Sequence, residues 1–347
     1  MSQNDPRAES AQLSGASAPT DPADPTGPAP AVGSTDPTGP STDPTDPSTD
    51  PTDPSADVDA PTEQRRPTWR VLFSNPITVI SALVLALVVL VALVGRWVIP
   101  FGVNSTDVLN ALQPPSAGHL FGTDDLGRDV FSRVIASTAV SLQVAVISVA
   151  FALGVGTAIG VTAGYVRGIV DTVLMRIVDV LFAFPVVLLA LVIVAILGTG
   201  MWTTMLAVGV VYTPIFARVS RASTLSVSVE PYVQVSRTMG TGHLFILFKH
   251  VLPNIMAPLI VQTSISLAFA ILTEATLSFL GVGIQPPQPS WGRMIFDAQS
   301  WIGQAWWMAV FPGAAIFVTV LAFNLFGDGL RDVMDPKQRS LMESRMK

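Results

Sequence analysis

The sequence predicts an all-α polytopic membrane protein with six transmembrane helices, one N-terminal span followed by a five-helix core. Half of its 347 residues are hydrophobic and only 13% are charged, a balance typical of chains embedded in a bilayer. Its long apolar runs are separated by more polar segments, and most runs are long enough to cross a hydrocarbon layer of about 30 Å. The chain has no cysteine, which excludes disulfides, thiolate metal sites and cysteine nucleophiles.

Residues 1–66 form an Asp-, Pro- and Thr-rich tail that we expect to be disordered. The first 64 residues hold one arginine against twelve acidic residues, whereas the rest of the chain has a net charge of +5, so the net charge of −6 comes from the tail. With almost no apolar side chains to bury, the tail cannot offset the entropy of ordering. It lacks the apolar stretch of a cleaved signal. A solvated tail is favoured over a partner-binding one.

The apolar runs define the predicted spans and domains. The spans cover approximately residues 77–99, 134–163, 172–197, 202–217, 255–281 and 306–326. The domains are the tail 1–66, the first span with an extracytoplasmic segment at 67–133, the core at 134–330 and a C-terminal tail at 331–347.

The basic residues predict the orientation of these spans. With the N-terminus inside, the outer loops hold four of the nineteen Lys and Arg residues, and the other fifteen lie on the cytoplasmic side. The four are Arg96, Arg128, Arg133 and Arg293. Both termini and the 230–253 loop are therefore expected in the cytoplasm of a multi-pass protein of the cell membrane.

Three glycines in the second span predict close helix packing. Gly156, Gly160 and Gly164 stand four residues apart, which places them on one helix face and allows another helix to approach. Gly154 and Gly156 do not form a nucleotide-binding loop, because the GxGxxG spacing fails and no strand precedes them.

Two carboxylates within the spans are candidate functional residues. Asp179 lies three residues after Arg176, so the two can pair on a helix; the alternative is a residue of the translocation path. Glu274 is the only acidic residue deep in an apolar run, and we expect it either to bond a neighbouring helix or to face the path. Pro185 is expected to kink the third span.

The outer segment after the first span contains a cluster of aspartates. Gly122, Asp124 and Gly127 are typical of turns, and a capped helix start follows them. A calcium loop is disfavoured because the EF-hand order and its terminal glutamate are missing. We expect no metal site.

Residues 230–253 are the longest polar interruption in the second half of the chain. Residues 230–239 predict a helix that ends at Gly240 in the left-handed conformation. Thr241 is expected to cap a second short helix, and Pro253 to close it or to open the next span. Leu244, Leu247 and Phe248 share one side of that helix. The loop is either a docking element or an amphipathic connector lying on the bilayer.

The spacing in this loop resembles the "EAA loop" of ATP-binding cassette (ABC) importer permeases. That pattern is Glu-Ala-Ala, three residues, Gly, nine residues, Ile, one residue and Leu-Pro; this chain keeps Gly240, Leu252 and Pro253. It departs at the triplet, which is Gln234-Val235-Ser236, and at His250 in place of the isoleucine. The residues that this resemblance assigns to ATPase coupling are Glu230, Gln234, Val235, Ser236, Gly240, Leu244, Phe248, His250, Leu252 and Pro253.

Further strings resemble the dipeptide/oligopeptide/nickel branch of these permeases. They are HLFGTDDLGRDVFSRV at 119–134, where the branch's C-type subunit has the same segment, LSFLGVGIQPPQPSWGRMI at 277–295 and AFNLFGDGLRDVMDPK at 322–337. The resemblance covers about residues 70–340, with these motifs in the same order as in the family. It implies the type I importer fold for the five-helix core.

The resemblance also implies partners and a substrate class. The partners are a homologous second permease, two ABC ATPases that carry ATP and magnesium, an extracytoplasmic solute-binding protein and membrane lipid, with no nucleic acid. The substrates are di- or oligopeptides, or alternatively nickel or another small solute.

The sequence itself carries no signature of catalysis. It lacks GxxxxGK[ST], HExxH and GxSxG motifs, so we expect no catalytic residue and no cofactor in this chain, and any ATP must be hydrolysed by a separate subunit. A self-contained secondary transporter or channel is the alternative. That class favours several intramembrane charges or inverted repeats, of which the sequence shows one deep carboxylate and no clear repeat. A non-transporting membrane scaffold is a third possibility.

Overall fold

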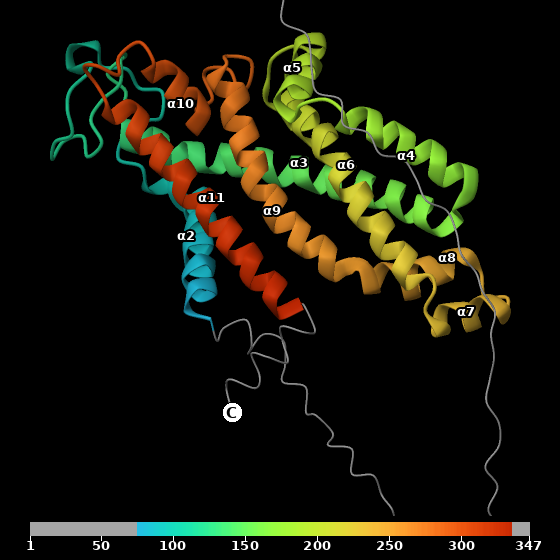
Figure 1. Ribbon diagram of the computed structural model, residues 1–347. Helices are drawn as coiled ribbons and strands as arrows, with labels where there is room; N and C mark the ends of the chain where they lie inside the picture. The colour runs from blue at the N-terminus through green and yellow to red at the C-terminus, as the bar shows by residue number, and fades with distance from the viewer. Residues whose placement is uncertain (1–74, 335–347) are drawn as a thin grey trace, which may run out of the picture. The chain divides into compact units, whose positions relative to one another are not determined.

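The computed structural model describes residues 75–334 as a bundle of helices with no β-strand among them (Figure 1). The 1–66 tail and most of the predicted C-terminal tail lie outside these residues. Five helical stretches are long and apolar enough to span a membrane, and a bent helix pair makes a sixth if it counts as one span. The prediction of an all-α polytopic membrane protein is confirmed.

The helices follow one another in a simple order. They are α2 (Pro76–Val98), a short turn η1 (Val108–Asn110), α3 (Val130–Val166), α4 (Gly168–Phe182), α5 (Val186–Leu197), α6 (Met201–Val227), α7 (Pro231–Thr238), α8 (His243–Ile246), a π-helical turn η2 (Leu247–Val251), α9 (Leu252–Phe279), α10 (Trp291–Ala298) and α11 (Trp307–Met334).

Local capping chemistry sets several of these boundaries. Asn75 accepts a hydrogen bond from the backbone N–H of Ile77 and Pro76 follows it, so α2 begins there. Asp129 accepts from the N–H of Ser132 and starts α3, which confirms the predicted capped helix start. The last helix continues to Met334, past the end predicted at 326.

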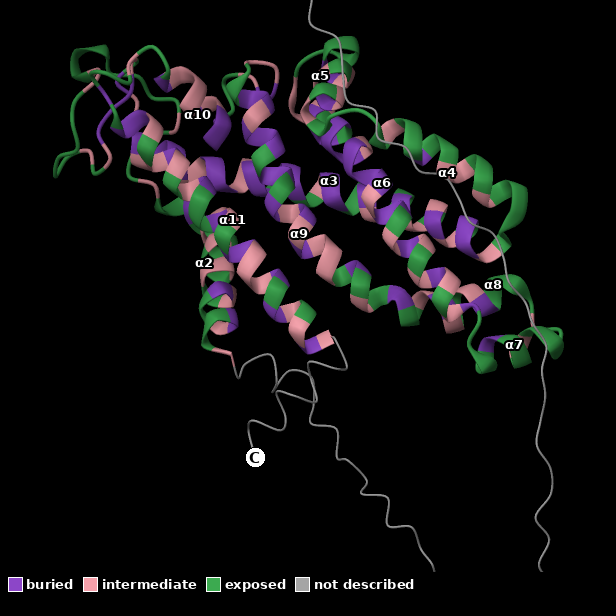
Figure 2. Ribbon diagram, in the orientation of Figure 1, coloured by how far each residue is buried: buried purple, intermediate pink, exposed green. Residues whose placement is uncertain are grey.

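Three helices form the buried centre of the bundle. The helices α3, α6 and α9 contact one another, while α11 packs on α9 and α2 (Figure 1). Buried residues concentrate on α3, α6 and α9, and α4 and α7 are largely exposed (Figure 2). Most apolar side chains of α2 are also exposed, as expected for a helix surrounded by lipid.

The close contact between α3 and α6 depends on the three spaced glycines. A Cβ atom on Gly156 would lie 2.6 Å from the Thr213 carbonyl oxygen, and one on Gly164 would lie 2.9 Å from the Arg221 carbonyl oxygen. One on Gly160 would overlap the backbone of α6. Only glycine allows the two backbones to approach this closely.

The third predicted span is not one straight helix. It divides into α4 and α5, which meet at a bend of 91°. Pro185 lies at the break, where it ends the helical hydrogen bonding of α4 and precedes the first residue of α5. The kink predicted at Pro185 is therefore confirmed, and it divides the predicted span 172–197 into two helices that together are either one broken span or a re-entrant loop.

The fourth span is longer than predicted. The helix α6 continues beyond residue 217, through Arg218 and Arg221, to Val227. No glycine or proline interrupts residues 218–227, and both arginines find carboxylate partners on α4. These pairs allow the helix to continue into a polar environment.

Candidate functional site

The first half of the 230–253 loop is a short helix ended by a glycine turn. Pro231 opens α7 at the position where its missing N–H costs nothing. Gly240 has φ +74°, and its N–H donates to the Arg237 carbonyl while the N–H of Thr241 donates to the Ser236 carbonyl. This double closure is the Schellman motif, which needs a residue in the left-handed conformation. The role predicted for Gly240 in the backbone turn is confirmed.

The second half of the loop runs without a break into α9. The N-cap of α8 is Gly242 with no side-chain hydrogen bond, so the prediction that Thr241 caps it was wrong. Pro253 lies in the first turn of α9 and opens the span. Its ring would clash with the Lys249 carbonyl in a regular α-helix, which accounts for the wider π-helical turn at 247–251 just before it.

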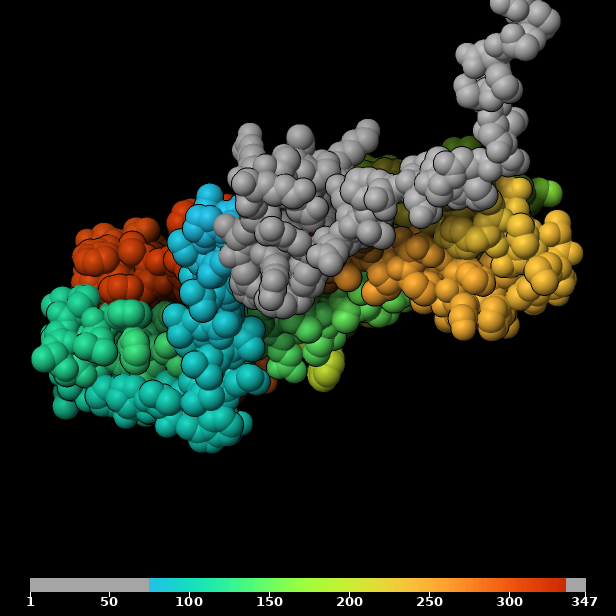
Figure 3. Space-filling view, turned by 90° about the horizontal axis from the view of Figure 1, so that it is seen from below, coloured from blue at the N-terminus to red at the C-terminus, as the bar shows by residue number. Residues whose placement is uncertain are grey.

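The loop presents many apolar side chains to its surroundings. Met239, Leu244 and Phe248 are 78%, 70% and 68% exposed. Val235 and Phe245 are also more than half exposed, whereas buried apolar residues anchor the loop to the bundle. The anchors are Val233, Ile246 and Val251. The loop lies at the opposite end of the described helices from α10 and the 99–129 segment (Figure 3).

The polar residues assigned to the loop are placed at its surface. Glu230 and Gln234 are exposed, and the Gln234 amide donates to the Val229 carbonyl at 2.9 Å. Ser236 and His250 are half-buried. The Ser236 hydroxyl donates to a carbonyl of its own helix, one turn earlier. The triplet Gln234-Val235-Ser236, which replaces the family's Glu-Ala-Ala, therefore leaves α7 a regular helix.

Two ion pairs connect α4 to α6. Asp179 pairs with Arg218 at 2.8 Å, and Asp171 accepts two hydrogen bonds from Arg221 at 2.5 and 2.6 Å. The predicted pairing of Asp179 with Arg176 was wrong, because the partner comes from another helix rather than from the next turn. The Asp179 and Arg218 side chains are about half exposed. Such an exposed pair contributes at most about 1 kcal/mol.

Glu274 lies at the centre of a buried polar network. Its side chain is fully buried and accepts hydrogen bonds from Ser141 of α3 at 3.2 Å and from Ser278 at 2.8 Å. The two serine oxygens in turn accept from the backbone N–H groups of Trp291 and Ile284. The carboxylate thus holds α3, α9 and the turn before α10 together.

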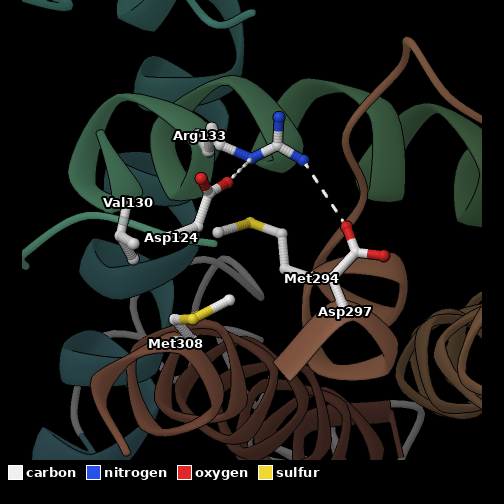
Figure 4. A pocket seen from close by; sticks show the side chains of 6 residues that line it. All are labelled: Asp124, Val130, Arg133, Met294, Asp297 and Met308. Carbon is white, nitrogen blue, oxygen red and sulfur yellow. Dashed lines mark ion pairs between the residues drawn. The ribbon is translucent and has the colours of Figure 1, made fainter. Parts of the chain in front are cut away.

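The 99–129 segment is fixed to the bundle by a cluster of charges (Figure 4). Arg133 of α3 lies 3.6 Å from Asp124 and 4.0 Å from Asp297 of α10. Arg128 bonds Asp124 at 2.6 Å, and two backbone N–H groups donate to the same carboxylate. The cavity between these residues holds only about 10 Å³, roughly the room for one water molecule. Asp124 is thus engaged by two arginines and by backbone N–H groups, and Asp129 by His119 and the N–H of Ser132.

The described helices define a polytopic all-α membrane protein. Residues 156–340 match the family described as "Binding-protein-dependent transport system inner membrane component", and residues 64–115 match the "N-terminal TM domain of oligopeptide transport permease C". The chain belongs to this family of inner-membrane transport components, the permeases of ABC importers.

Several curated relatives match most of the chain. The glutathione transport system permease protein GsiD of Pectobacterium atrosepticum is 42% identical over 79% of this chain and 92% of its own. The dipeptide transport system permease protein DppC of Alkalihalophilus pseudofirmus is 40% identical over 79% and 90%. The probable D,D-dipeptide transport system permease protein DdpC of Escherichia coli is 39% identical over 77% and 89%.

Proposed function

We propose that this chain forms, with a homologous second permease, the translocation path of an importer for di- or oligopeptides. A solute-binding protein delivers the peptide on the outer side, and two separate ATPases hydrolyse ATP on the inner side. The 230–253 loop docks on an ATPase and passes its movement to the spans. The chain itself hydrolyses no ATP.

The exposed apolar surface of the loop carries this proposal. Apolar side chains of this size, gathered on a short element that projects from the bundle, are typical of a protein–protein contact. The left-handed turn at Gly240 sets the angle between α7 and α8, so the surface has a defined form. A rigid helix–turn–helix is what a docking contact needs, because little ordering entropy opposes binding.

The distribution of charge supports the orientation. In the predicted topology, fifteen of the nineteen basic residues fall on the side of the 230–253 loop and both termini, as in a chain with its N-terminus inside. This charge bias supports a cytoplasmic position for the loop, on the side of the ATPases.

The relatives support a peptide substrate. Three that match more than three quarters of the chain are named for transport of glutathione, dipeptides and D,D-dipeptides. All three are short peptides. We therefore assign peptides to this chain ahead of nickel or other small solutes.

The decisive experiment compares two glycines in the same loop. A glutamate at Gly240 must adopt φ near +74°, at a cost of about 1–2 kcal/mol for a side chain in the left-handed region. We expect Gly240→Glu to weaken co-purification with a tagged ATPase by about 5- to 30-fold and to uncouple hydrolysis from uptake. The variant should still insert in the membrane.

Gly242→Glu is the matched control. It introduces the same charge two residues away, at a residue with φ −57° and open space around it. It should bind the ATPase as the wild type does. Normal association and uptake in Gly240→Glu, or uptake by the chain in liposomes without an ATPase, would refute the proposed function.

A further inference from the structure

The loop reaches the three central helices in different ways. It is joined to α6 through residues 228–230 and to α9 through the π-helical turn, so those helices follow the loop through the chain itself. The helix α3 has no such link. A groove of about 370 Å³ lies between residues 154–162 of α3 and the apolar side of α8 and η2, lined there by Leu244, Leu247 and Phe248.

Tyr165 lies in the last turn of α3, just beyond the end of this groove, and connects α3 to the loop. Its hydroxyl lies 3.0 Å from Nδ1 of His243, the first residue of α8. The guanidinium carbon of Arg237, in the last turn of α7, lies 4.4 Å from the centre of the tyrosine ring. One side chain of α3 therefore contacts both helices of the loop, one on each side of the Gly240 turn.

The N-terminal end of α3 lies at the 99–129 segment and α10, at the opposite end of the bundle from the 230–253 loop. The helix has 37 residues, a length of about 55 Å at 1.5 Å per residue. Its first turns hold Arg133, in the charge cluster of the 99–129 segment, and Ser141, which bonds Glu274. Its last third is locked to α6 by Gly156, Gly160 and Gly164. A displacement at Tyr165 thus reaches α10 and the outer segment through a stiff element.

We infer that Tyr165 is a positioning residue for transport, which ties α3 to the movement of the 230–253 loop through His243 and Arg237. This inference depends on the proposed function, since it assigns the route by which the loop acts on the helix that carries no chain connection to it. The hydrogen bond fixes α8 and the cation–π contact fixes α7. Without the tyrosine, the loop still moves α6 and α9, but α3 follows only through their packing.

The test measures peptide uptake and ATP hydrolysis in the same proteoliposomes. They contain the full chain, its second permease and the two ATPases, with the solute-binding protein and a radiolabelled dipeptide outside. Tyr165→Phe removes the hydroxyl and keeps the ring over which Arg237 lies. We expect peptide taken up per ATP hydrolysed to fall by roughly 2- to 12-fold, the range of one hydrogen bond. The hydrolysis rate, the bound ATPase and the melting temperature stay as in the wild type.

Further variants identify the contact that is responsible. Tyr165→Leu, which removes both contacts, should lower the ratio more than Tyr165→Phe. His243→Ala should resemble Tyr165→Phe, and the double variant should be no worse than the more affected single one, because both changes remove the same bond. Tyr212→Phe is the matched control: it removes a tyrosine hydroxyl that also lies 3.0 Å from its partner, Thr273, but between α6 and α9, two helices that the chain itself joins to the loop.

Each outcome decides the inference. A wild-type ratio in Tyr165→Phe, or an equal loss in Tyr212→Phe, overturns it while leaving the loop's docking role intact. Additive losses in the double variant overturn it as well, since the two residues would then act separately. If Tyr165→Phe does not assemble, the same criteria apply to His243→Ala. Uptake by the wild-type complex without ATP would reject the proposed function and this inference together.

Discussion

At the scale of single residues, the buried carboxylate of Glu274 shows how a membrane protein accommodates a polar group. Both of its oxygens accept hydrogen bonds from serines, and those serines also satisfy the backbone of the segment before α10. An unpartnered polar group in this position would cost several kcal/mol. The network therefore supports a structural interhelical role for Glu274, and we propose that role ahead of a place on the translocation path.

Asp125 illustrates the opposite case, a carboxylate with too few partners. Burial and the neighbouring Asp124 raise the pKa of Asp125 above its ordinary value of 3.8, although Arg128 opposes this. One of its oxygens is buried without a hydrogen bond among the described residues. The folded protein therefore holds the proton of the Asp125 carboxyl more tightly than the unfolded chain does. As pH rises above 3.8, the pKa of the unfolded chain, the contribution of Asp125 to stability decreases.

We therefore expect Asp125→Asn to raise the unfolding temperature at pH 7, because the neutral amide avoids the cost of a buried carboxyl whose charged form the folded protein disfavours. The difference should shrink as pH falls toward 3.8, because the wild-type side chain then becomes neutral as well. Thermal unfolding of the purified protein in detergent at several pH values measures it. A variant less stable than the wild type at pH 7, or a gap that does not change with pH, would contradict this reasoning.

At the scale of elements, the contact between α3 and α6 is the most demanding in the bundle. Gly160→Ala places a methyl group against the Ala217 carbonyl and the Ser220 side chain. The two helices must then move apart, with an expected loss of about 1–3 kcal/mol in stability. Gly154→Ala is the matched control on the same helix, because nothing lies within 4 Å of its Cβ position. It should be neutral or stabilising by up to about 1 kcal/mol. Unfolding in detergent, or membrane yield, separates the two; equal behaviour would contradict the packing argument.

The same elements show which features the sequence could predict. The four-residue spacing of Gly156, Gly160 and Gly164 predicted a close helix contact, because spacing alone places residues on one face. The spacing could not say that α6 is the partner. The predicted pairing of Asp179 with Arg176 was wrong for the same reason. Arg176 is near Asp179 in sequence, but the structure pairs Asp179 with Arg218. Ion-pair partners depend on tertiary packing, which local spacing does not contain.

In the 230–253 loop, too, some features could be predicted from the sequence and others could not. Gly240 was predictable, since a polar helix followed by glycine indicates a left-handed end. The N-cap at Gly242 and the π-helical turn before Pro253 were not, because a continuous helix over α8 and α9 suits the local sequence equally well. Tyr165 was missed altogether. It lies at the end of an apolar span, and only the fold brings it to His243 and Arg237.

At the scale of the whole molecule, the described helices connect two surfaces at opposite ends of the bundle. One end carries the 230–253 loop, and the other carries α10 and the 99–129 segment, held by the charges around Arg133. The helix α3 runs between them and contacts features of both. This arrangement suits a permease whose energy enters at one face and whose substrate enters at the other.

The two ends also provide a matched pair of exposed leucines for testing which surface binds the ATPase. Leu244 of α8 is 70% exposed and Leu109 of the turn η1 is 94% exposed. Replacing an apolar residue that anchors a protein interface costs more than about 1 kcal/mol, and about 2 kcal/mol at a hot spot. We expect Leu244→Gln to weaken ATPase binding by about 5- to 30-fold in a titration with detergent-solubilised permease, and Leu109→Gln to leave it unchanged. If Leu244→Gln binds the ATPase as well as Leu109→Gln does, the ATPase contact lies elsewhere. If Leu244 contacts lipid and Leu244→Gln leaves ATPase binding unchanged, the loop is instead a connector that lies on the bilayer.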